Sequence, residues 1–391
     1  MKDIERLVIV DPIFRGSRKH YSSLACELTK NAKEITVLSR KEGNGKTSEG
    51  RTFKNVKMIG VFSFSADFWY GRIGLKNTFL FIVWLLKTKP RGGCYYFCGL
   101  NEWMPWFFLV SIALKYTKSR AVVVDYEGKY WSDSVSSFKS KFSRYYRQLL
   151  IRYNKNLKVA LLDERIVEAY DSPQINFLPD PAVIKEKLQF SRNNKVQTVF
   201  LTFGLQSERK GIRYIEKLIS SYEKELHEAM IKVVCIGKLS EETVDISEKL
   251  NTLSNESRVF DWINKYVSDE ELVKFVSDSD AILLPYTPQF QGSSGVLAHA
   301  CAWGLPVLSS EHGLIGYRVK TYSLGDSFVA DDTSSLYKGL LRVKELVLQD
   351  YTATDVYKMG RVRFLENFSE DKHLATLRKI LQEIDEIDYS Y

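Results

Sequence analysis

The stretch Thr198–Gly237, TVFLTFGLQSERKGIRYIEKLISSYEKELHEAMIKVVCIG, places two apolar runs on either side of an amphipathic segment. The runs Thr198–Thr202 and Ile231–Ile236 lack apolar–polar alternation, which predicts strands buried on both faces of a parallel sheet. The segment between them, Lys210–Leu226, repeats apolar residues at spacings of three and four, which predicts a helix. Together they indicate a strand–helix–strand unit with a right-handed crossover.

The same alternation of short apolar runs and amphipathic segments continues through all 391 residues. Because parallel strands need crossover helices, it predicts an α/β protein with two Rossmann-like, doubly wound domains. In the first half we expect strands at Leu7–Val10, Ile35–Leu38, Val56–Val61, Cys94–Phe97, Ala121–Val124, Lys158–Leu162 and Ile175–Leu178. In the second half we expect strands at Thr198–Thr202, Ile231–Ile236, Arg258–Phe260, Asp280–Leu284, Leu305–Leu308 and Ser327–Ala330.

The domain boundary is predicted from a segment that is first punctuated by proline and then polar, LPDPAVIKEKLQFSRNNKVQ (Leu178–Gln197). We therefore expect an N-terminal domain over residues 1–190 and a C-terminal domain over residues 195–360. A last amphipathic segment, about Glu366–Ile387, is expected to pack back on the first domain. Ligands of doubly wound sheets bind at the carboxyl ends of strands, so function is sought in the loops that follow strands.

Composition is that of an ordinary soluble globular protein, with 45% hydrophobic and 27% charged residues. A net charge of +8 favours anionic partners, but no recognisable nucleic-acid-binding module accompanies it, so no nucleic acid is expected. The five cysteines are scattered, which argues against a disulfide framework and against zinc. We expect neither a metal nor a cofactor.

The N-terminus, MKDIERLVIVDP, has charges on both sides of a four-residue apolar run. This pattern predicts a first strand and not a signal peptide. No run reaches the roughly 18 apolar residues that span a bilayer. We therefore expect an intracellular, cytoplasmic protein.

The loop after the first strand, DPIFRGSRKHYSS, passes through Gly16 and Ser17 into a predicted helix with Arg18–His20 in its first turn. Glycine permits close backbone approach, and the amides of a helix N-terminus favour a negative group. A turn with a solvated basic face is the other interpretation, and both stay open.

The loop after Thr198–Thr202 places Lys210 at the start of the next helix, beside Arg209. A lysine at this position opposes the helix dipole and is unfavourable as a purely structural cation. A bound anion would offset that cost, which favours a functional role for Lys210 and leaves Arg209 open.

A third loop begins the stretch Gln289–Gly313, QFQGSSGVLAHACAWGLPVLSSEHG. Its residues Gly292, Ser293, Ser294 and Gly295 precede a short apolar helix that ends at Gly304. Ser294 suits a simple N-cap, but a cap does not explain two glycines and two hydroxyls. A diphosphate would use the free amides and the hydroxyls together.

The second half resembles the nucleotide-sugar-binding domain of GT-B glycosyltransferases, most closely the large retaining family four. Three stretches carry the likeness, namely Leu201–Leu218, Ser268–Tyr286 and Gly295–Gly313. More loosely, Arg15–His20 resembles the family's glycine-rich acceptor-side loop, and Ala121–Gly128 resembles a strand that often ends in histidine. The resemblance implies a GT-B architecture in which an interdomain cleft holds a nucleoside-diphosphate sugar.

Several family positions carry other residues here. Gln291 stands where the family has a glutamate that contacts the donor sugar, and His299 where a second glutamate contacts the ribose. Both can hydrogen-bond hydroxyl groups, but neither is a carboxylate. Leu205 replaces an arginine, so Lys210 carries over alone for the phosphates, and Asp125 occupies the histidine position. The donor sugar and the stereochemistry remain open.

The resemblance implies transfer of a sugar from a nucleoside-diphosphate sugar to a glycan or lipid-linked acceptor, in polysaccharide or glycoconjugate biosynthesis. It implies a retaining, metal-independent reaction in which Lys210 neutralises the leaving diphosphate. Asp125 or Glu127, at a strand end, would instead suit a general base for inversion, although Glu127 also suits pairing with Lys129. A catalytically inactive GT-B-like scaffold subunit and a sugar-nucleotide epimerase are the alternatives.

The segment Phe138–Lys158, FKSKFSRYYRQLLIRYNKNLK, contains seven basic residues and no acid. Its apolar stripe at helical spacing consists of Phe138, Phe142, Tyr145/Tyr146, Leu149 and Tyr153. This pattern predicts a basic amphipathic helix. Either the stripe packs on the first sheet, or the helix meets anionic lipid at the inner face of the cell membrane.

Two further segments of the first half are rich in aromatic residues. Asn77–Lys87 predicts a helix packed in the core. In Asn101–Tyr116, two interpretations stay open for the aromatic cluster at Trp103, Met104, Trp106 and Phe107, namely core packing or a place at an acceptor groove or membrane interface. Peripheral association with an anionic membrane is therefore expected.

Overall fold

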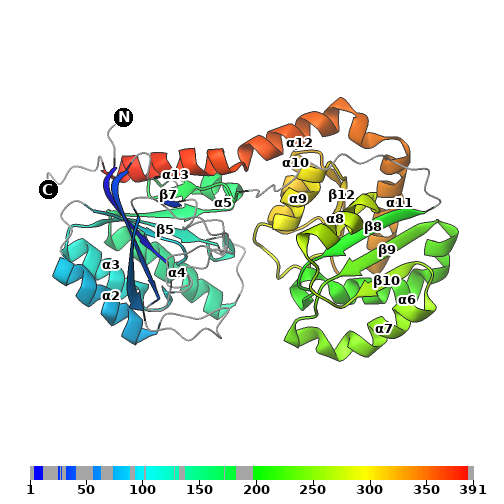
Figure 1. Ribbon diagram of the computed structural model, residues 1–391, viewed down its shortest axis with the longest axis horizontal. Coiled ribbons are helices and arrows are strands. Elements are labelled where there is room, and N and C mark those ends of the chain that lie inside the picture. Colours follow the sequence, from blue (N-terminus) through cyan, green and yellow to red (C-terminus); the bar gives the residue numbers. More distant parts are fainter. Residues whose placement is uncertain are drawn as a thin grey trace. The chain divides into compact units, whose positions relative to one another are not determined.

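A computed structural model describes residues 4–11, 25–26, 28, 32–40, 56–62, 74–88, 93–100, 103–126, 128–131, 137–170, 172–181 and 197–385. The described chain forms two compact units. Unit 1 contains the residues up to 181 together with 368–385, and unit 2 contains residues 197–367. Each unit holds one fully parallel sheet flanked by helices (Figure 1). The predicted sites at Gly16, Ser17 and Glu127 lie outside the described residues.

The sheet of unit 1 has seven strands in the order β3-β2-β1-β4-β5-β6-β7. They are β1 (Ile4–Val10), β2 (Ala32–Arg40), β3 (Val56–Phe62), β4 (Cys94–Phe97), β5 (Arg120–Asp125), β6 (Leu157–Leu161) and β7 (Ile175–Phe177). All seven expected strands are therefore present. Successive side chains of β1 enter different cores, Leu7 and Ile9 on one face and Val8 and Val10 on the other. Both faces are covered, which is why the run has no polar alternation.

Unit 1 has five described α-helices, α2 (Leu75–Thr88), α3 (Phe107–Tyr116), α4 (Phe138–Tyr153), α5 (Glu164–Ala169) and α13 (Glu370–Asp385). Helix α4 has Ser137 as its N-cap and Asn154 as its C-cap, and the Ser137 hydroxyl accepts a hydrogen bond from the Ser140 amide. The predicted helical segment therefore stops short of Lys158, which lies on β6. No helix in the described part of the chain is both long and apolar enough to cross a membrane.

Two residues of the aromatic cluster, Trp103 and Phe107, pack inside unit 1, whereas Met104 and Trp106 are half-buried. Trp103 and Phe107 are fully buried in the core beneath α2, α3 and α4, and the Trp103 ring meets Phe81 and Phe97 edge-on. A place for Trp103 or Phe107 at a groove or a membrane interface is therefore excluded, because neither ring reaches solvent.

The C-terminal helix α13 covers the other face of the same sheet (Figure 1). Leu377, Ile380, Leu381 and Ile384 are buried against β1, β4, β5 and β6. Two polar contacts fix its position. Glu383 pairs with Lys158 at 2.6 Å, and the His373 ring shares a hydrogen bond of 2.7 Å with the Pro179 carbonyl. Helix α13 thus buries one face of the first sheet.

The sheet of unit 2 has six strands in the order β10-β9-β8-β11-β12-β13. They are β8 (Thr198–Phe203), β9 (Ile231–Ile236), β10 (Phe260–Ile263), β11 (Ala281–Leu284), β12 (Val307–Ser310) and β13 (Gly325–Phe328). Three of them are displaced by about two residues from the expected ranges 258–260, 305–308 and 327–330. In β12 the cause is Pro306, which has no amide to donate, so pairing starts at Val307.

The helices of unit 2 are α6 (Ile212–Glu228), α7 (Ser247–Glu256), α8 (Asp269–Ser277), α9 (Gly295–Trp303), α10 (Gly313–Thr321), α11 (Thr333–Leu348) and α12 (Asp355–Asn367). From β8 the chain first adds β9 and β10 on one side, and then returns to add β11, β12 and β13 on the other. The order of strands therefore reverses between β8 and β11. In doubly wound sheets, ligands bind at this switch point, beyond the carboxyl ends of the strands.

Leu381→Ala tests the role of α13. We expect it to lower the free energy of unfolding by about 3 kcal/mol, because it leaves a cavity under the first sheet. Lys379→Ala, on the same helix but 77% exposed, should change it by less than about 0.5 kcal/mol. Urea denaturation measures both, and equal stability of the two variants would contradict the packing described for α13.

Candidate functional site

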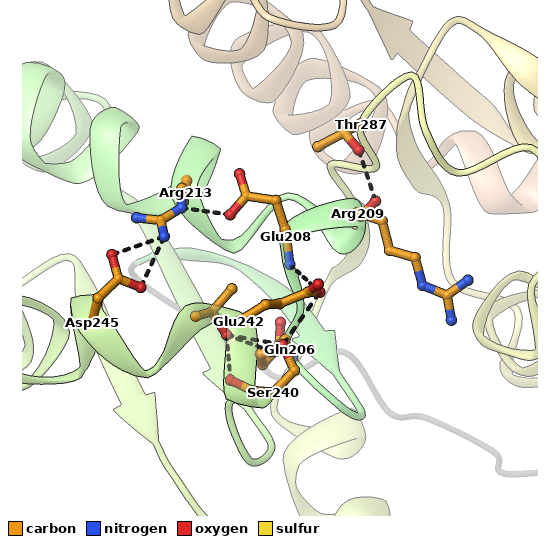
Figure 2. A network of polar contacts seen from close by, with 9 residues as sticks. Gln206, Glu208, Arg209, Arg213, Ser240, Glu242, Asp245 and Thr287 are labelled. Atoms are coloured by element: carbon orange, nitrogen blue, oxygen red, sulfur yellow. Dashed lines mark hydrogen bonds and ion pairs between the residues drawn. The ribbon is translucent and has the colours of Figure 1, made fainter. Parts of the chain in front are cut away.

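Two loops that follow neighbouring strands of unit 2 are bonded to each other at the switch point. The carbonyl of Arg209, after β8, accepts hydrogen bonds from the amide and the hydroxyl of Thr287, after β11, at 3.0 and 3.3 Å (Figure 2). Gly211 has a positive φ of 79°, and a Cβ there would lie 1.7 Å from the Pro285 carbonyl oxygen. Only glycine permits this approach, which fixes one loop against the other.

Lys210 ends the short 3₁₀ helix Glu208–Lys210, and its side chain is only partly exposed. Its ammonium lies against Gly204, 3.3 Å from where a Cβ of that glycine would stand. Burial and then the nearby charge of Arg209 lower the pKa of Lys210 to about 8. Among the described residues no carboxylate pairs with it, so the charge of Lys210 is uncompensated within unit 2.

Acidic residues do lie on the adjoining loops, but they are engaged elsewhere. Arg213 donates to the Glu208 carboxylate at 2.5 Å and to both carboxylate oxygens of Asp245 at 2.8 Å. The Glu242 carboxylate accepts a hydrogen bond from the Glu208 amide at 3.3 Å. Figure 2 shows the side chain of Arg209 pointing away from these acids. These acids therefore do not pair with Arg209 or Lys210.

Arg209 is exposed, and its guanidinium lies 5.5 Å from the centre of the Phe290 ring. Phe290 in turn packs on Tyr286 at 4.3 Å. This contact places the second cation beside the loop that leads into the predicted Gly292–Gly295 turn.

Helix α9 begins without a side-chain cap. Ser294 occupies the N-cap position, but its hydroxyl is hydrogen-bonded to Tyr286 at 2.9 Å and does not reach the helix amides. Burial raises the pKa of Tyr286 to about 12, so its hydroxyl stays neutral and holds Ser294. A Cβ added to Gly295 would meet nothing within 4 Å. The simple N-cap role of Ser294 is therefore excluded, and a side chain at Gly295 would have room beside the start of α9.

The opposite end of α9 is satisfied inside the protein. Arg361 of α12 donates to the carbonyls of Cys301 and Ala302, and Gly304 ends the helix with a φ of 72°. The negative end of the helix dipole is thus balanced by an arginine, whereas no side chain caps the positive end.

The other two predicted residues of this loop and helix also lie near these strand ends. His299 stacks on Trp303 at 5.1 Å and meets the ring of Phe203, the last residue of β8, at 6.4 Å. Gln291 donates to the Pro288 carbonyl at 2.7 Å and lies next to Gly313, the first residue of α10. Lys210, Arg209, Ser294, His299 and Gln291 are therefore gathered around β8 and β11.

The whole chain is similar to solved glycosyltransferase structures. It matches a glycosyltransferase from Rickettsia africae with a TM-score of 0.69 and 14% identity, covering 98% of this chain and 99% of that one. It matches the lipopolysaccharide outer core galactosyltransferase WaaB with a TM-score of 0.63 and 13% identity, covering 97% of this chain and 99% of that one. It matches HepE of Anabaena, solved with UDP-glucose, with a TM-score of 0.64 and 11% identity, covering 97% of this chain and 99% of that one.

The chain has the GT-B fold. Identities this low show the fold alone, and no protein-family model and no curated protein matches the sequence. Units 1 and 2 are its two Rossmann-like domains, and the gathered residues lie on the second of them.

His312, Tyr286 and Phe290 are parts of this GT-B unit that the sequence did not single out. His312 shares a hydrogen bond of 2.8 Å with the Thr287 carbonyl, and its other ring nitrogen is buried with no partner in the described structure. Two sequence features could have pointed to them. They are the aromatic residues just after a strand, in LLPYTPQF, and the histidine before the glycine that starts α10.

Asp125 ends β5 of unit 1, but it is fully buried and does not face solvent as expected of a general base. Its carboxylate accepts from Arg147 at 2.6 Å and from the Trp131 indole at 2.8 Å, and Arg147 lies over the Tyr130 ring. This arrangement favours a structural role over the predicted catalytic one. In the described parts of the GT-B units, no cluster of three or more His, Cys, Asp or Glu side chains is placed to hold a metal ion.

Asp125→Asn should lower the free energy of unfolding by about 3–5 kcal/mol, because it leaves Arg147 charged and unpaired in the interior. Asp125→Asn combined with Arg147→Met should recover most of that loss. Asp245→Asn, at a side chain that is 61% exposed, should cost less than about 1 kcal/mol. Urea denaturation checks all three, and an Asp125→Asn variant as stable as the wild type would rule out the structural role.

Lys210→Met should raise the free energy of unfolding at pH 7 by about 2 kcal/mol, a value discounted for the partial exposure of Lys210. Below pH 8 the lysine is charged in both states, so the full penalty of burying it is present. Between about 8 and its unfolded value of 10.5, only the unfolded lysine stays charged, and the wild type regains stability as pH rises. The advantage of the variant should therefore shrink between pH 8 and 10, measured by urea denaturation, while Lys217→Met, at an exposed position of α6, changes little at any pH.

Proposed function

We propose that the protein is a glycosyltransferase that moves a sugar from a nucleoside-diphosphate sugar to a glycan or lipid-linked acceptor. The uncompensated charge of Lys210, set at the switch point beside an uncapped helix start, carries this proposal. A partly buried cation without a carboxylate partner favours an anion from outside, and a helix N-terminus binds phosphate readily. The GT-B fold supports it, since the similar HepE was solved with UDP and with UDP-glucose.

In this proposal the diphosphate rests on the turn Gly292–Gly295, with Lys210 and Arg209 as its counter-charges. The bond between the anomeric carbon and the diphosphate oxygen breaks and its electrons pass to the diphosphate. The oxygen of an acceptor hydroxyl forms the new bond to the anomeric carbon, and the proton of that hydroxyl passes to the departing diphosphate. Fixed cations and amides stabilise that growing charge more in the transition state than in the ground state. Protein cations in this role make the reaction metal-independent.

His299 and Gln291 are assigned to hydroxyl groups of the ribose and the sugar. The burial of Asp125 favours a retaining reaction, in which no protein base is required, over inversion assisted by that carboxylate. Unit 1 is assigned to the acceptor, and Gly16 and Ser17 in its first loop are assigned to the nucleotide or sugar of the donor. The proposed setting is polysaccharide or glycoconjugate biosynthesis at the cytoplasmic face of the cell membrane.

A binding or scaffold subunit without turnover is the second candidate. The observation that favours it is the absence of carboxylates at Gln291 and His299, where the resembling family uses two glutamates. Such a subunit would bind the nucleotide sugar as described and release no nucleotide.

Lys210→Met should weaken binding of the nucleoside diphosphate at least tenfold and lower turnover by about 10²–10³-fold, because it removes a fixed donor from the leaving group. Gly295→Ala should leave stability almost unchanged, since the new methyl meets open space, but should weaken binding where the diphosphate is to lie. Lys217→Met is the control and should bind as the wild type does. Calorimetry with UDP, GDP and ADP and their sugars measures binding, and nucleotide release measures turnover.

The same panel separates the candidates. Release of nucleotide with water or an acceptor supports transfer, exchange at C2 of the sugar identifies an epimerase, and binding without turnover identifies the scaffold. A wild type that binds none of these nucleotides contradicts the proposed donor site.

A further inference from the structure

Three helices of unit 1 form one layer over a single face of its sheet, as the lower part of that unit in Figure 1 shows. Tyr146 of α4 donates to the Pro105 carbonyl at 2.6 Å and accepts from the Phe108 amide of α3 at 2.7 Å. Asn154, after α4, donates to Ser111 of α3 at 3.2 Å, and α2 packs beside α3. We call the outer surface of α2, α3 and α4 the helical face.

The helical face carries every exposed large hydrophobic side chain in the described part of unit 1. On α4, Phe138 is 86% exposed, Phe142 59% and Tyr145 61%. The full set is Leu75, Phe79 and Leu86 of α2, Leu109, Ile112 and Tyr116 of α3, and Phe138, Phe142, Tyr145 and Leu149 of α4. On each helix these residues are separated by three, four or seven positions, so they lie along one side. An apolar surface of this extent marks an interaction site.

The predicted stripe of α4 therefore divides between two environments. Phe138, Phe142, Tyr145 and Leu149 face solvent, whereas Tyr146 hydrogen-bonds α3 and Tyr153 packs on Phe108. Arg147 is turned inward by its pair with Asp125. This anchored inner side determines which side of α4 is left outside, and packing of the four outer residues on the sheet is excluded.

The charges of the helical face have one sign. The sequences of the three helices contain no acidic residue and eight basic ones, two on α2, one on α3 and five on α4. Exposed among them are Lys76, Lys87, Lys115, Lys141 and Arg152. An ordinary solvated helix of this protein differs, since α6 in unit 2 mixes four glutamates with its cations.

We propose that the helical face docks on the surface of an anionic lipid bilayer. Exposed aromatic and aliphatic side chains enter the boundary between headgroups and acyl chains, and flanking lysines meet the lipid phosphates. Lysine is depleted at the core of protein interfaces, yet four of the five exposed cations here are lysines, which favours lipid over a protein partner. The proposal goes beyond the donor chemistry and rests on a different unit of the chain.

Flotation of the full chain with vesicles tests it. The wild type should float with phosphatidylcholine vesicles that contain about one-third phosphatidylglycerol, and should stay unbound with phosphatidylcholine alone. Lys141→Gln with Arg152→Gln should lower the partition coefficient about 25-fold, at about fivefold for each charge removed. Phe138→Ser with Phe142→Ser should lower it at least tenfold, because both side chains are exposed and their loss leaves the core intact.

Matched controls lie on unit 2. Lys217→Gln with Lys338→Gln removes two exposed charges from α6 and α11, and Val356→Ser with Met359→Ser removes two exposed apolar side chains from α12. Both double variants should float within about twofold of the wild type. A control that loses binding as strongly as the α4 variants would show a general charge or hydrophobicity effect and overturn the assignment.

Three other results would also overturn it. They are equal recovery of the wild type with anionic and neutral vesicles, flotation of the α4 variants like the wild type, and a wild-type dimer in light scattering that Phe138→Ser with Phe142→Ser dissociates. The last would make the helical face an interface between copies of the chain. All α4 variants keep the donor-site residues, so nucleotide binding should be unchanged in them. Failure of the proposed function would appear separately, as a wild type that floats but binds no nucleotide.

Discussion

A lysine ammonium held partly out of water with no carboxylate beside it is the constraint on which the interpretation of unit 2 depends. Removing a cation from water is unfavourable unless an anion accompanies it. The adjoining loops contain acids, but Glu208 and Asp245 are committed to Arg213. Among the described residues Lys210 therefore has no carboxylate partner, and under the proposed function its counter-ion would be the donor diphosphate.

The backbone of unit 2 holds Lys210 in that position through glycines. A Cβ on Gly237 would lie 1.8 Å from the Gly204 carbonyl oxygen, and one on Gly211 would lie 1.7 Å from that of Pro285. The loops at the carboxyl ends of β8, β9 and β11 can therefore approach one another more closely than residues other than glycine would allow. Close approach brings the lysine, the hydroxyl of Ser294 and the uncapped start of α9 to one edge of the sheet, where strand order reverses.

The strands were predictable because a run buried on both faces has a composition that no exposed segment shares, and all thirteen expected strands occur in the described chain. Lys210 was singled out because a lysine beside a helix start is unfavourable without an anion, and its role at a donor site stays a prediction. The burial of Asp125 was not, since its partners Trp131 and Arg147 lie 6 and 22 residues away and only the fold brings them together. The same limit applies to Ser294, because capping and bonding to Tyr286 use the same hydroxyl, and sequence alone does not choose between them.

Burial and pairing together distinguish three roles that basic residues have in this chain. Arg147 is buried and paired, so its charge is spent on holding α4 against β5. Lys210 is partly buried and has no carboxylate partner among the described residues, which is unfavourable for folding alone and fits the proposed anionic ligand. Lys141 and Arg152 are exposed on a helix that also has exposed aromatic rings and no acids, which folding alone does not require. Because each of the helices α2, α3 and α4 also carries large apolar residues on its exposed side, we interpret the helical face as a surface that is covered when the protein works.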